Sequence, residues 1–298
     1  MTIQFDCPNC HELIAFADQH RGKRARCTTC GQRFIIPLAS DETAKKIDPP
    51  KEEAEPLPGF YRAVFIDNWK LFAGTRNTAG LVLAAAVVCF KFFAGHTDYS
   101  WTFGRFRFQA PTGLLITLGA WGCLFWYYME VISTAALDNE ELPEVDMGGF
   151  FGFIWNVAAS LFVFAVLLML VLLPSIIYFA VSTRAGIVWY VLVHAGLFVF
   201  PMAILTFSIV RDFGLVFRPD YVLRPIAKAP GPYLVVFGLF ALAWELQLRT
   251  VGYGRLANSS NFIIALHLLA NLAVQAIAII AMRSAGLFYR HYSGHFRW

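Results

Sequence analysis

The sequence MGGFFGFIWNVAASLFVFAVLLMLVLLPSIIYFAVST, residues 147–183, contains no Asp, Glu, Lys or Arg. A helix of about 20 apolar residues crosses the roughly 30 Å hydrocarbon core of a bilayer. The run is therefore too long for one straight crossing and slightly short for two crossings with a turn. We expect one spanning helix at about 154–180, bent near Pro174 because proline removes a backbone hydrogen bond. An interfacial aromatic segment at 150–153 would precede it, and two spans are the alternative.

The rest of the chain is similarly apolar. Of its 298 residues, 58% are hydrophobic and 15% are charged, whereas soluble domains have about 25% charged residues. A soluble protein of this size cannot cover so much apolar surface, because a large part of its surface stays in water. The composition predicts an all-α polytopic membrane bundle. The uncharged runs predict six spans, at about 78–95, 111–137, 154–180, 186–210, 232–249 and 260–283.

The segment GFYRAVFIDNWKLFAG, residues 59–74, precedes the first span and alternates apolar with charged residues. This pattern is typical of an amphipathic helix that lies in the headgroup plane. An ordinary juxtamembrane stub is the alternative. The apolar residues expected to share the membrane face of this interfacial helix are Phe60, Val64, Phe65, Trp69 and Phe72.

The distribution of Lys and Arg predicts the orientation of the six spans. Ten of these residues flank the spans on the side that holds both termini, and five flank them on the other side. Cytoplasmic loops carry the excess of Lys and Arg, so both termini are expected in the cytoplasm, with the bundle in the cytoplasmic (inner) membrane. The first thirty residues also lack the apolar region of a signal peptide. The loop 138–146 is discordant because it is acidic, but acidic residues contribute little to orientation.

The N-terminal residues 1–38 contain two Cys-x-x-Cys pairs, C7-P-N-C10 and C27-T-T-C30. Two such pairs at this separation are typical of a four-cysteine zinc site, and sites of this kind are structural. Iron in the same ligand set is the alternative. Alternating runs at 3–5, 13–16 and 34–36 predict short strands. So small a β domain has little core, so Zn²⁺ is expected to fold it.

The pattern C-P-x-C, followed by Gly22-x4-Cys27-x-x-Cys30-Gly31-x-x-Phe34, resembles the small zinc-ribbon domain at the N-termini of many bacterial proteins. The remainder resembles uncharacterised multi-spanning bacterial membrane families. The residues that carry this second likeness are 142–146 (LPEVD), the apolar span ending near 173–174, and 200–203 (FPMA). Together the two resemblances imply a zinc ribbon fused to a membrane domain, and they imply no catalytic residues.

Several features around the ribbon have competing interpretations. The stretch HRGKRARC, residues 20–27, is basic and could contact lipid headgroups or nucleic acid, but a solvated hairpin beside the thiolates explains it better. His11 and His20 could replace a cysteine ligand, although four cysteines already complete a tetrahedral shell. Residues 39–58 are charged and rich in proline, so we expect a disordered linker. Cys89 and Cys123 lie in apolar runs and are expected to pack.

Ionisable residues inside the spans require an explanation, because a charge in the membrane costs a few kcal/mol. Lys91, His194, Glu245 and His267 are predicted to lie at a similar depth, with Glu245 paired to His267. Asn271 and Gln275 continue from His267 at intervals of four and form an inward polar stripe. This layer would be either a path for ions or hydrogen-bonding glue between helices, and we favour glue.

The loop DNEELPEVD (138–146) is expected to face the same compartment as the basic loop 211–228, so ion pairs between the two are predicted. Binding of a divalent cation is the alternative, but the loop lacks the glycine and the spacing of an EF-hand. The acidic residues of this loop are Asp138, Glu140, Glu141, Glu144 and Asp146.

The sequence lacks the phosphate-binding, zinc-protease and serine-hydrolase motifs, which argues against an enzyme. The leading interpretation is a non-enzymatic membrane scaffold or regulator, in which the ribbon docks a cytoplasmic protein. A small transporter or channel that uses the polar layer is the second interpretation, and a lipid-binding factor in envelope assembly is the third. The lipid bilayer is the certain partner, nucleic acid is not favoured, and the sequence leaves the oligomeric state open.

Overall fold

The computed structural model describes residues 2–7, 10, 12–17, 24–27, 29–30, 33–37, 45–47, 56–103, 106–137, 141–145, 149–182 and 186–296. The chain divides into two compact units, Met1–Ala54 and Glu55–Trp298. Each unit is described by itself below.

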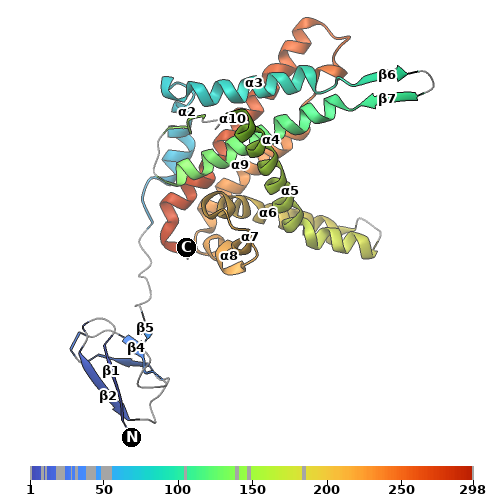
Figure 1. Cartoon of the computed structure of the whole chain (residues 1–298). Helices are drawn as coiled ribbons and strands as arrows, with labels where there is room; N and C mark the ends of the chain where they lie inside the picture. Colours follow the sequence, from blue (N-terminus) through green and yellow to red (C-terminus); the bar gives the residue numbers. More distant parts are fainter. Residues whose placement is uncertain are drawn as a thin grey trace. The chain divides into compact units, whose positions relative to one another are not determined.

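The described part of the second unit contains six helices that are long and apolar enough to cross a membrane (Figure 1). A helix of this kind covers each of the six predicted spans, with ends that differ by a few residues except in the third and the last. The chain is, by these helices, a multi-pass membrane protein. The helices are α3 (Thr78–Ala94), α4 (Thr112–Ala136), α5 (Gly149–Ser182), α6 (Ile187–Val210), α9 (Pro230–Leu248) and α10 (Asn261–Tyr292).

The uncharged run that suggested either one span or two forms the single helix α5, so the one-span prediction is confirmed. The aromatic segment at 150–153 belongs to this helix as its first turn, and the helix continues through Pro174. Phe151 is 85% exposed, as expected for a side chain that reaches lipid. Helix α10 also extends nine residues beyond the predicted end of its span, as far as Tyr292.

Helices α4 and α10 form the centre of the bundle. They pack against each other, and α4 also packs against α3, α5 and α6, while α9 packs mainly on α10. In the most apolar window of each helix, 56% of α4 is buried but only 17% of α9. The outer faces of α5, α6 and α10 carry large exposed apolar side chains, including Trp155, Ile187 and Phe262. Such a surface is stable when hydrocarbon surrounds it.

Close approach of the helices depends on glycine at two positions of the centre. A Cβ atom on Gly122 of α4 would lie 2.5 Å from the backbone oxygen of Val157 on α5. A Cβ atom on Gly286 of α10 would lie 2.4 Å from the backbone oxygen of Ile132 on α4. Membrane helices gain no hydrophobic driving force from each other, so they depend on this kind of close packing.

The segment before α3 is helical, as predicted, and consists of α1 (Phe60–Arg62), a π-helical turn η2 (Ala63–Asp67) and α2 (Asn68–Lys70). The predicted membrane face is wrong. Phe60 and Val64 are buried in the bundle, whereas Phe65 and Trp69 are more than half exposed. At about 100° per residue, Trp69 lies about 180° from Phe60, so the two cannot share a face.

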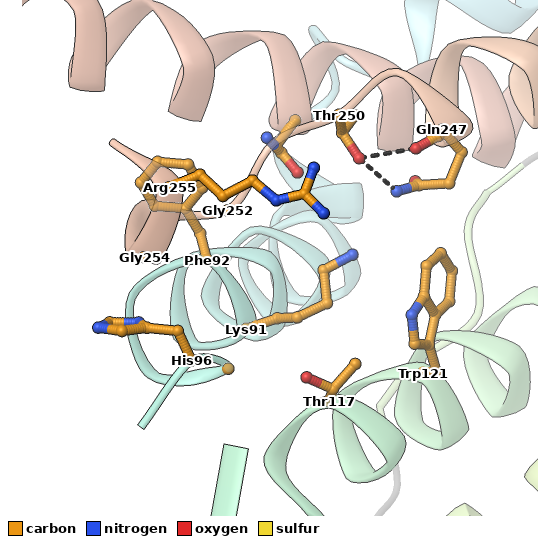
Figure 2. Close-up of a pocket in the computed structure, with 12 residues that line it drawn as sticks. Lys91, Phe92, His96, Thr117, Trp121, Gln247, Thr250, Gly252, Gly254 and Arg255 are labelled. Atoms are coloured by element: carbon orange, nitrogen blue, oxygen red, sulfur yellow. Dashed lines mark hydrogen bonds between the residues drawn. The ribbon is translucent and has the colours of Figure 1, made fainter. Parts of the chain in front are cut away.

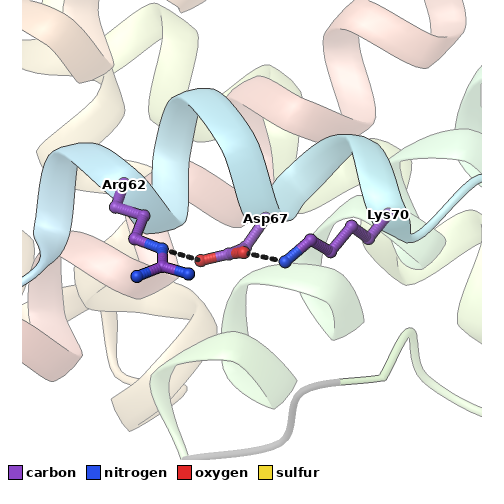
Figure 3. Close-up of polar contacts among 3 residues, drawn as sticks. All are labelled: Arg62, Asp67 and Lys70. Atoms are coloured by element: carbon purple, nitrogen blue, oxygen red, sulfur yellow. Dashed lines mark hydrogen bonds and ion pairs between the residues drawn. The ribbon is translucent and has the colours of Figure 1, made fainter.

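The exposed side of this segment also carries an ion-paired cluster (Figure 3). The ammonium group of Lys70 lies 2.6 Å from one carboxylate oxygen of Asp67, and the guanidinium group of Arg62 lies 3.9 Å from the other. The hydrogen bond from Lys70, with the charges of Lys70 and Arg62, lowers the pKa of Asp67. The buried side is anchored by Asn68, whose amide donates to the Ser284 hydroxyl of α10 at 3.3 Å.

The connections between spans also contain regular structure. Strands β6 (Tyr99–Phe103) and β7 (Phe106–Ala110) form an antiparallel hairpin between α3 and α4 that projects beyond the helix ends (Figure 1). The short helices α7 (Phe213–Val216) and α8 (Pro219–Lys228) connect α6 to α9. Three short 3₁₀ turns, η3 (Thr75–Asn77), η4 (Tyr253–Arg255) and η5 (Ser293–His295), lie at helix ends.

The described part of the first unit consists of two small sheets. Strands β1 (Thr2–Asp6) and β2 (Leu13–Ala17) form an antiparallel hairpin, and β3 (Arg24–Arg26), β4 (Arg33–Ile35) and β5 (Lys45–Ile47) form the second sheet. The three predicted strands are therefore present. The rings of Phe5, Phe16 and Phe34 pack together beside the cysteines.

Strand β5 lies inside 39–58, where the charged and proline-rich composition predicts a disordered linker. The prediction of disorder is therefore not met at Lys45–Ile47, because these three residues pair with β4 and complete its sheet. The other residues between 38 and 55 lie outside the described part of the chain.

We predict that Gly122→Ala lowers the stability of the bundle, because its methyl group would press on the backbone of α5 and overpacking typically costs about 1–3 kcal/mol. The matched control is Gly119→Ala on the same helix, where nothing lies within 4 Å of the added carbon. Thermal unfolding of the purified chain in detergent measures both. Equal midpoints for the two variants would contradict the close packing of α4 on α5.

Candidate metal centre and intramembrane polar network

The four cysteines of the first unit converge on one point. Cys7 follows β1, Cys27 follows β3, and Cys10 and Cys30 lie in the turns after them. Their four sulfur atoms lie within 4.8 Å of one another. The Sγ atoms of Cys7 and Cys30 are 3.6 Å apart, and those of Cys10 and Cys27 are 3.8 Å apart. The predicted set of four ligands is therefore brought together and could hold a metal ion.

These distances can be compared with the geometry of a tetrahedral site. Four sulfurs placed about 2.3 Å from a central zinc ion are separated by about 3.8 Å. The two measured separations match this value, whereas a disulfide would need about 2.05 Å between sulfurs. All four cysteines are free thiols. The donor set and its spacing thus fit a tetrahedral metal ion with four thiolate ligands.

Backbone hydrogen bonds favour the thiolate of Cys27 by lowering its pKa. At Cys10 desolvation and the surrounding thiols act in the opposite direction. The N–H groups of Cys30 and Thr29 lower the pKa of Cys27. The N–H of Glu12 also lowers the pKa of Cys10, but desolvation and hydrogen bonds with the other three thiols outweigh it and raise that pKa to about 12. Four thiolates cannot gather without a compensating cation, and a bound metal ion supplies that charge.

Other candidate residues of the ribbon lie outside the described residues. These are His11, His20, Arg21 and Lys23, so their proposed contacts stay predictions. The backbones of Arg24 and Arg26 form β3, which pairs with β4, so this part of the basic stretch is one strand of a sheet.

The ionisable residues of the predicted polar layer lie on four helices, each within about 11 Å of a helix end on the same side of the bundle. No hydrogen bond or ion pair joins any two of them in the described part of the chain. With about 1.5 Å of rise per residue, Lys91 and Glu245 lie about 5 Å from the ends of α3 and α9. His194 is exposed on α6, where its Nδ1 lies 2.7 Å from the backbone oxygen of Tyr190 on the same helix. His267 is half-buried on α10. These four side chains are therefore dispersed over four helices rather than gathered at one site.

The predicted pair of Glu245 and His267 is wrong. The guanidinium group of Arg249 binds the Glu245 carboxylate at 2.6 Å and 3.0 Å, one turn farther along the chain. Both side chains of this pair are more than half exposed. Because α9 ends at Leu248, Glu245 lies at the end of a span, where a polar partner is accessible.

The predicted stripe of Asn271 and Gln275 does turn inward, and both residues are at least 96% buried. The Tyr128 hydroxyl of α4 donates to Oε1 of Gln275, and Nε2 of Gln275 donates to Oε1 of Gln247 on α9 at 2.7 Å. Nε2 of Gln247 then donates to the Thr250 hydroxyl at 2.8 Å. This chain of bonds connects three helices and matches the interpretation of the stripe as glue.

The side-chain amide of Asn271, one turn before Gln275 on α10, forms two further hydrogen bonds. Its Nδ2 donates to the backbone oxygen of His267 at 2.8 Å and to that of Val251 at 3.2 Å. The second bond attaches the loop after α9 to α10. Sequence reasoning missed Tyr128 and Gln247, although polar side chains on neighbouring spans are the signal that would have found them.

The acidic loop pairs with a different partner from the predicted one. The carboxylate of Glu141 lies 2.6 Å from the guanidinium group of Arg76, which lies at the start of the first span, whereas a pair with the loop 211–228 was predicted. The backbone N–H of Leu142 donates to the buried side chain of Asn77 at 2.8 Å. Glu144 is exposed. The remaining acids, Asp138, Glu140 and Asp146, lie outside the described residues.

An ion pair joins the basic loop to α4. Arg211, at the end of α6, lies 2.7 Å from the carboxylate of Glu130 on α4. Arg211 has a φ of 58°, a left-handed conformation that ends the helix. Glu130 lies near the end of α4, and the pair connects two neighbouring helices there.

No protein-family model matches the sequence, and comparisons with curated proteins and with solved structures found no match. The two resemblances given above therefore stay expectations. The fold and the site define a class: a multi-pass membrane protein with an N-terminal four-cysteine cluster suited to a metal ion.

We predict that Gln275→Leu lowers the free energy of unfolding by about 1 kcal/mol, because the mutation breaks the bonds to Tyr128 and Gln247. Glu245→Gln should change it little, since an exposed ion pair contributes about 0–1 kcal/mol. Equilibrium unfolding in mixed detergent measures both variants. A larger loss for Glu245→Gln than for Gln275→Leu would favour the Glu245–His267 pair instead.

Proposed function

We propose that the first unit is a zinc ribbon, in which one structural Zn²⁺ ion is held by Cys7, Cys10, Cys27 and Cys30. The observation that carries this proposal is the pair of sulfur separations, 3.6 Å and 3.8 Å, which fit tetrahedral coordination. Zinc suits a shell of four thiolates with no position left for water, so its role is structural and not catalytic. Binding of the ion would contribute most of the folding free energy of so small a unit.

The membrane domain anchors this ribbon on the side that holds both ends of the bundle. Six crossings return the chain to its starting side, and the start of the unit contacts its end. The N–H of Leu57 donates to the backbone oxygen of His291 at 2.8 Å. Nδ1 of His291 lies 2.9 Å from the backbone oxygen of Leu57. The excess of Lys and Arg on this side supports a cytoplasmic location for the ribbon and both termini.

The role we infer is a scaffold or regulator that presents the ribbon to a cytoplasmic protein. Two observations favour it over a transporter that uses a Glu245–His267 layer. The ionisable side chains of that layer are dispersed, and the polar network of Tyr128, Gln275 and Gln247 bonds to itself. On the ribbon, Leu13 of β2 is 63% exposed, which supplies an apolar contact point of the kind that protein partners bury.

We predict that the purified full-length chain contains about one zinc ion per polypeptide and that Cys27→Ser loses most of it. Cys89→Ser is the matched control, since Cys89 lies on α3, outside the cluster, and it should retain the metal. Elemental analysis measures zinc and iron together. Zinc content should fall as the pH is lowered, because protons compete with the metal for the thiolates. Iron in place of zinc, or equal loss from both variants, would contradict the proposal.

The docking role predicts specific crosslinks from the ribbon. A photo-crosslinking amino acid at Leu13 of the full chain, in intact cells, should capture a defined cytoplasmic protein. The additional change Cys27→Ser should abolish this product, because the ribbon would unfold without its metal. The same probe at Asn258, an exposed residue at the other end of the bundle, is the control and should not capture it. Crosslinks that persist in Cys27→Ser would contradict docking by the folded ribbon.

A further inference from the structure

A cavity of about 500 Å³ lies at the end of the bundle opposite Leu57 and His291 (Figure 2). It is formed where α3 ends, α4 begins, α9 ends and α10 begins. Its volume lies in the range of small-molecule sites. The side chains that line it include Lys91, Thr117, Trp121, Gln247, Thr250 and Arg255.

Two basic side chains extend into this cavity. Figure 2 shows the ammonium group of Lys91 and the guanidinium group of Arg255 directed into the same space, from α3 and from η4. The ammonium group lies 4.1 Å from the centre of the Trp121 ring. Two like charges that share a cavity at the edge of a membrane repel each other unless an anion lies between them.

The described residues supply no such anion. Neither Asp nor Glu is among those that line the cavity, and neither Lys91 nor Arg255 forms an ion pair with a described residue. The sequence contains no acidic residue after Glu245 and none from 99 to 129. The two acids nearest in the sequence are occupied: Arg249 binds Glu245, and Asp98 accepts from the backbone N–H of Gly113 at 3.2 Å.

The second large cavity of the bundle differs in this respect. It measures about 720 Å³ and lies at the end of the bundle that holds His291, near Asp67 and Glu141. Each of these acids forms an ion pair, with Lys70 and with Arg76 respectively, both at 2.6 Å. Positive charge there is balanced in part by the protein itself. The cavity around Lys91 differs in that no acidic residue is among its described lining, whereas two acids line the second cavity.

Depth and lining indicate the chemistry of the anion. Lys91 lies about 5 Å from the end of α3, which places it near the headgroup layer of a bilayer, where phosphates are abundant. Lys and Arg form strong charge-assisted hydrogen bonds with phosphate oxygens. The hydroxyls of Thr117 and Thr250 add neutral hydrogen-bonding groups, and Trp121 presents an apolar face to carbon atoms of the ligand.

We propose that this cavity binds a phosphate ester through Lys91 and Arg255. The ester can belong to an anionic phospholipid headgroup or to a soluble phosphate compound, since the groups that recognise it are the same. The site does not depend on the metal centre, so the Cys27→Ser chain should bind the ester as well as the native chain does.

Native mass spectrometry of the full chain in detergent tests this proposal. Phosphatidylglycerol and zwitterionic phosphatidylcholine are titrated in one arm, and sn-glycerol 3-phosphate in the other. We expect phosphatidylglycerol to bind in preference to phosphatidylcholine, and Lys91→Gln and Arg255→Gln each to weaken that binding about tenfold, since each removes one charged hydrogen bond. If the soluble ester binds with the same dependence on both residues, the source is a soluble compound.

The matched control is Arg249→Gln. It removes one positive charge from the same end of the bundle, but Arg249 does not line the cavity and is paired with Glu245, so binding should change less than about twofold. Arg255 is exposed in η4, so its variant stays informative if Lys91→Gln misfolds. The proposal is overturned if neither ester binds, if phosphatidylcholine binds as tightly as phosphatidylglycerol, or if Arg249→Gln weakens binding as much as Arg255→Gln.

Discussion

Hydrocarbon offers no hydrogen-bonding partners, and this constraint governs the second unit. Every backbone N–H and C=O in a span must be satisfied within its own segment, so the chain adopts long helices there. The same requirement acts on side chains. Tyr128, Gln275 and Gln247 each carry polar groups that would be costly in lipid, and they satisfy one another across three helices. The polar network therefore helps to determine how α4, α9 and α10 pack against each other.

The first unit is limited by its small hydrophobic core, because very few of its described residues are buried. Phe5, Phe34 and Ile36 form a small core with two of the cysteines. Domains of this size are rarely stable through hydrophobic burial alone. Without a cation, desolvation and hydrogen bonds with the other three thiols raise the pKa of Cys10 to about 12, which disfavours the thiolate. A metal ion would remove this cost and join the two Cys-x-x-Cys turns, so folding and binding would be one process.

The sequence predicted the spans well because bilayer thickness fixes their length and charge is excluded from their interior. It also predicted the four-cysteine cluster, since the spacing of the cysteines is itself the signal. Features that depend on tertiary contacts were harder to predict from the sequence. Glu245 was placed within a span because the apolar residues around it continue as far as Arg249, the residue that binds it. The strands β6 and β7 follow from two runs of alternating apolar and polar residues, a pattern that a search for spans does not examine.

The burial of Phe60 and Val64 could have been predicted from helical periodicity, whereas their partners could not. Phe60 contacts Phe288, His291 and Tyr292 of α10, which are more than 220 positions away in the sequence. An isolated amphipathic segment can turn its apolar face to lipid or to protein, and only the presence of the bundle decides. Here the face with Phe60 and Val64 packs in the bundle, and the face with Phe65 and Trp69 is left exposed.

The charged residues at the two ends of the bundle are paired differently. At the end that holds Leu57 and His291, Arg76 pairs with Glu141 and Arg211 pairs with Glu130, so these charges hold helices and loops together. At the other end, the sequence supplies few acids, and Lys91 and Arg255 share a cavity without an acidic residue among its described lining. Charges that serve only packing are paired within the fold. Charges that share a cavity without a partner are paired when a ligand is present, so the end around Lys91 is where this bundle is most suited to recognise another molecule.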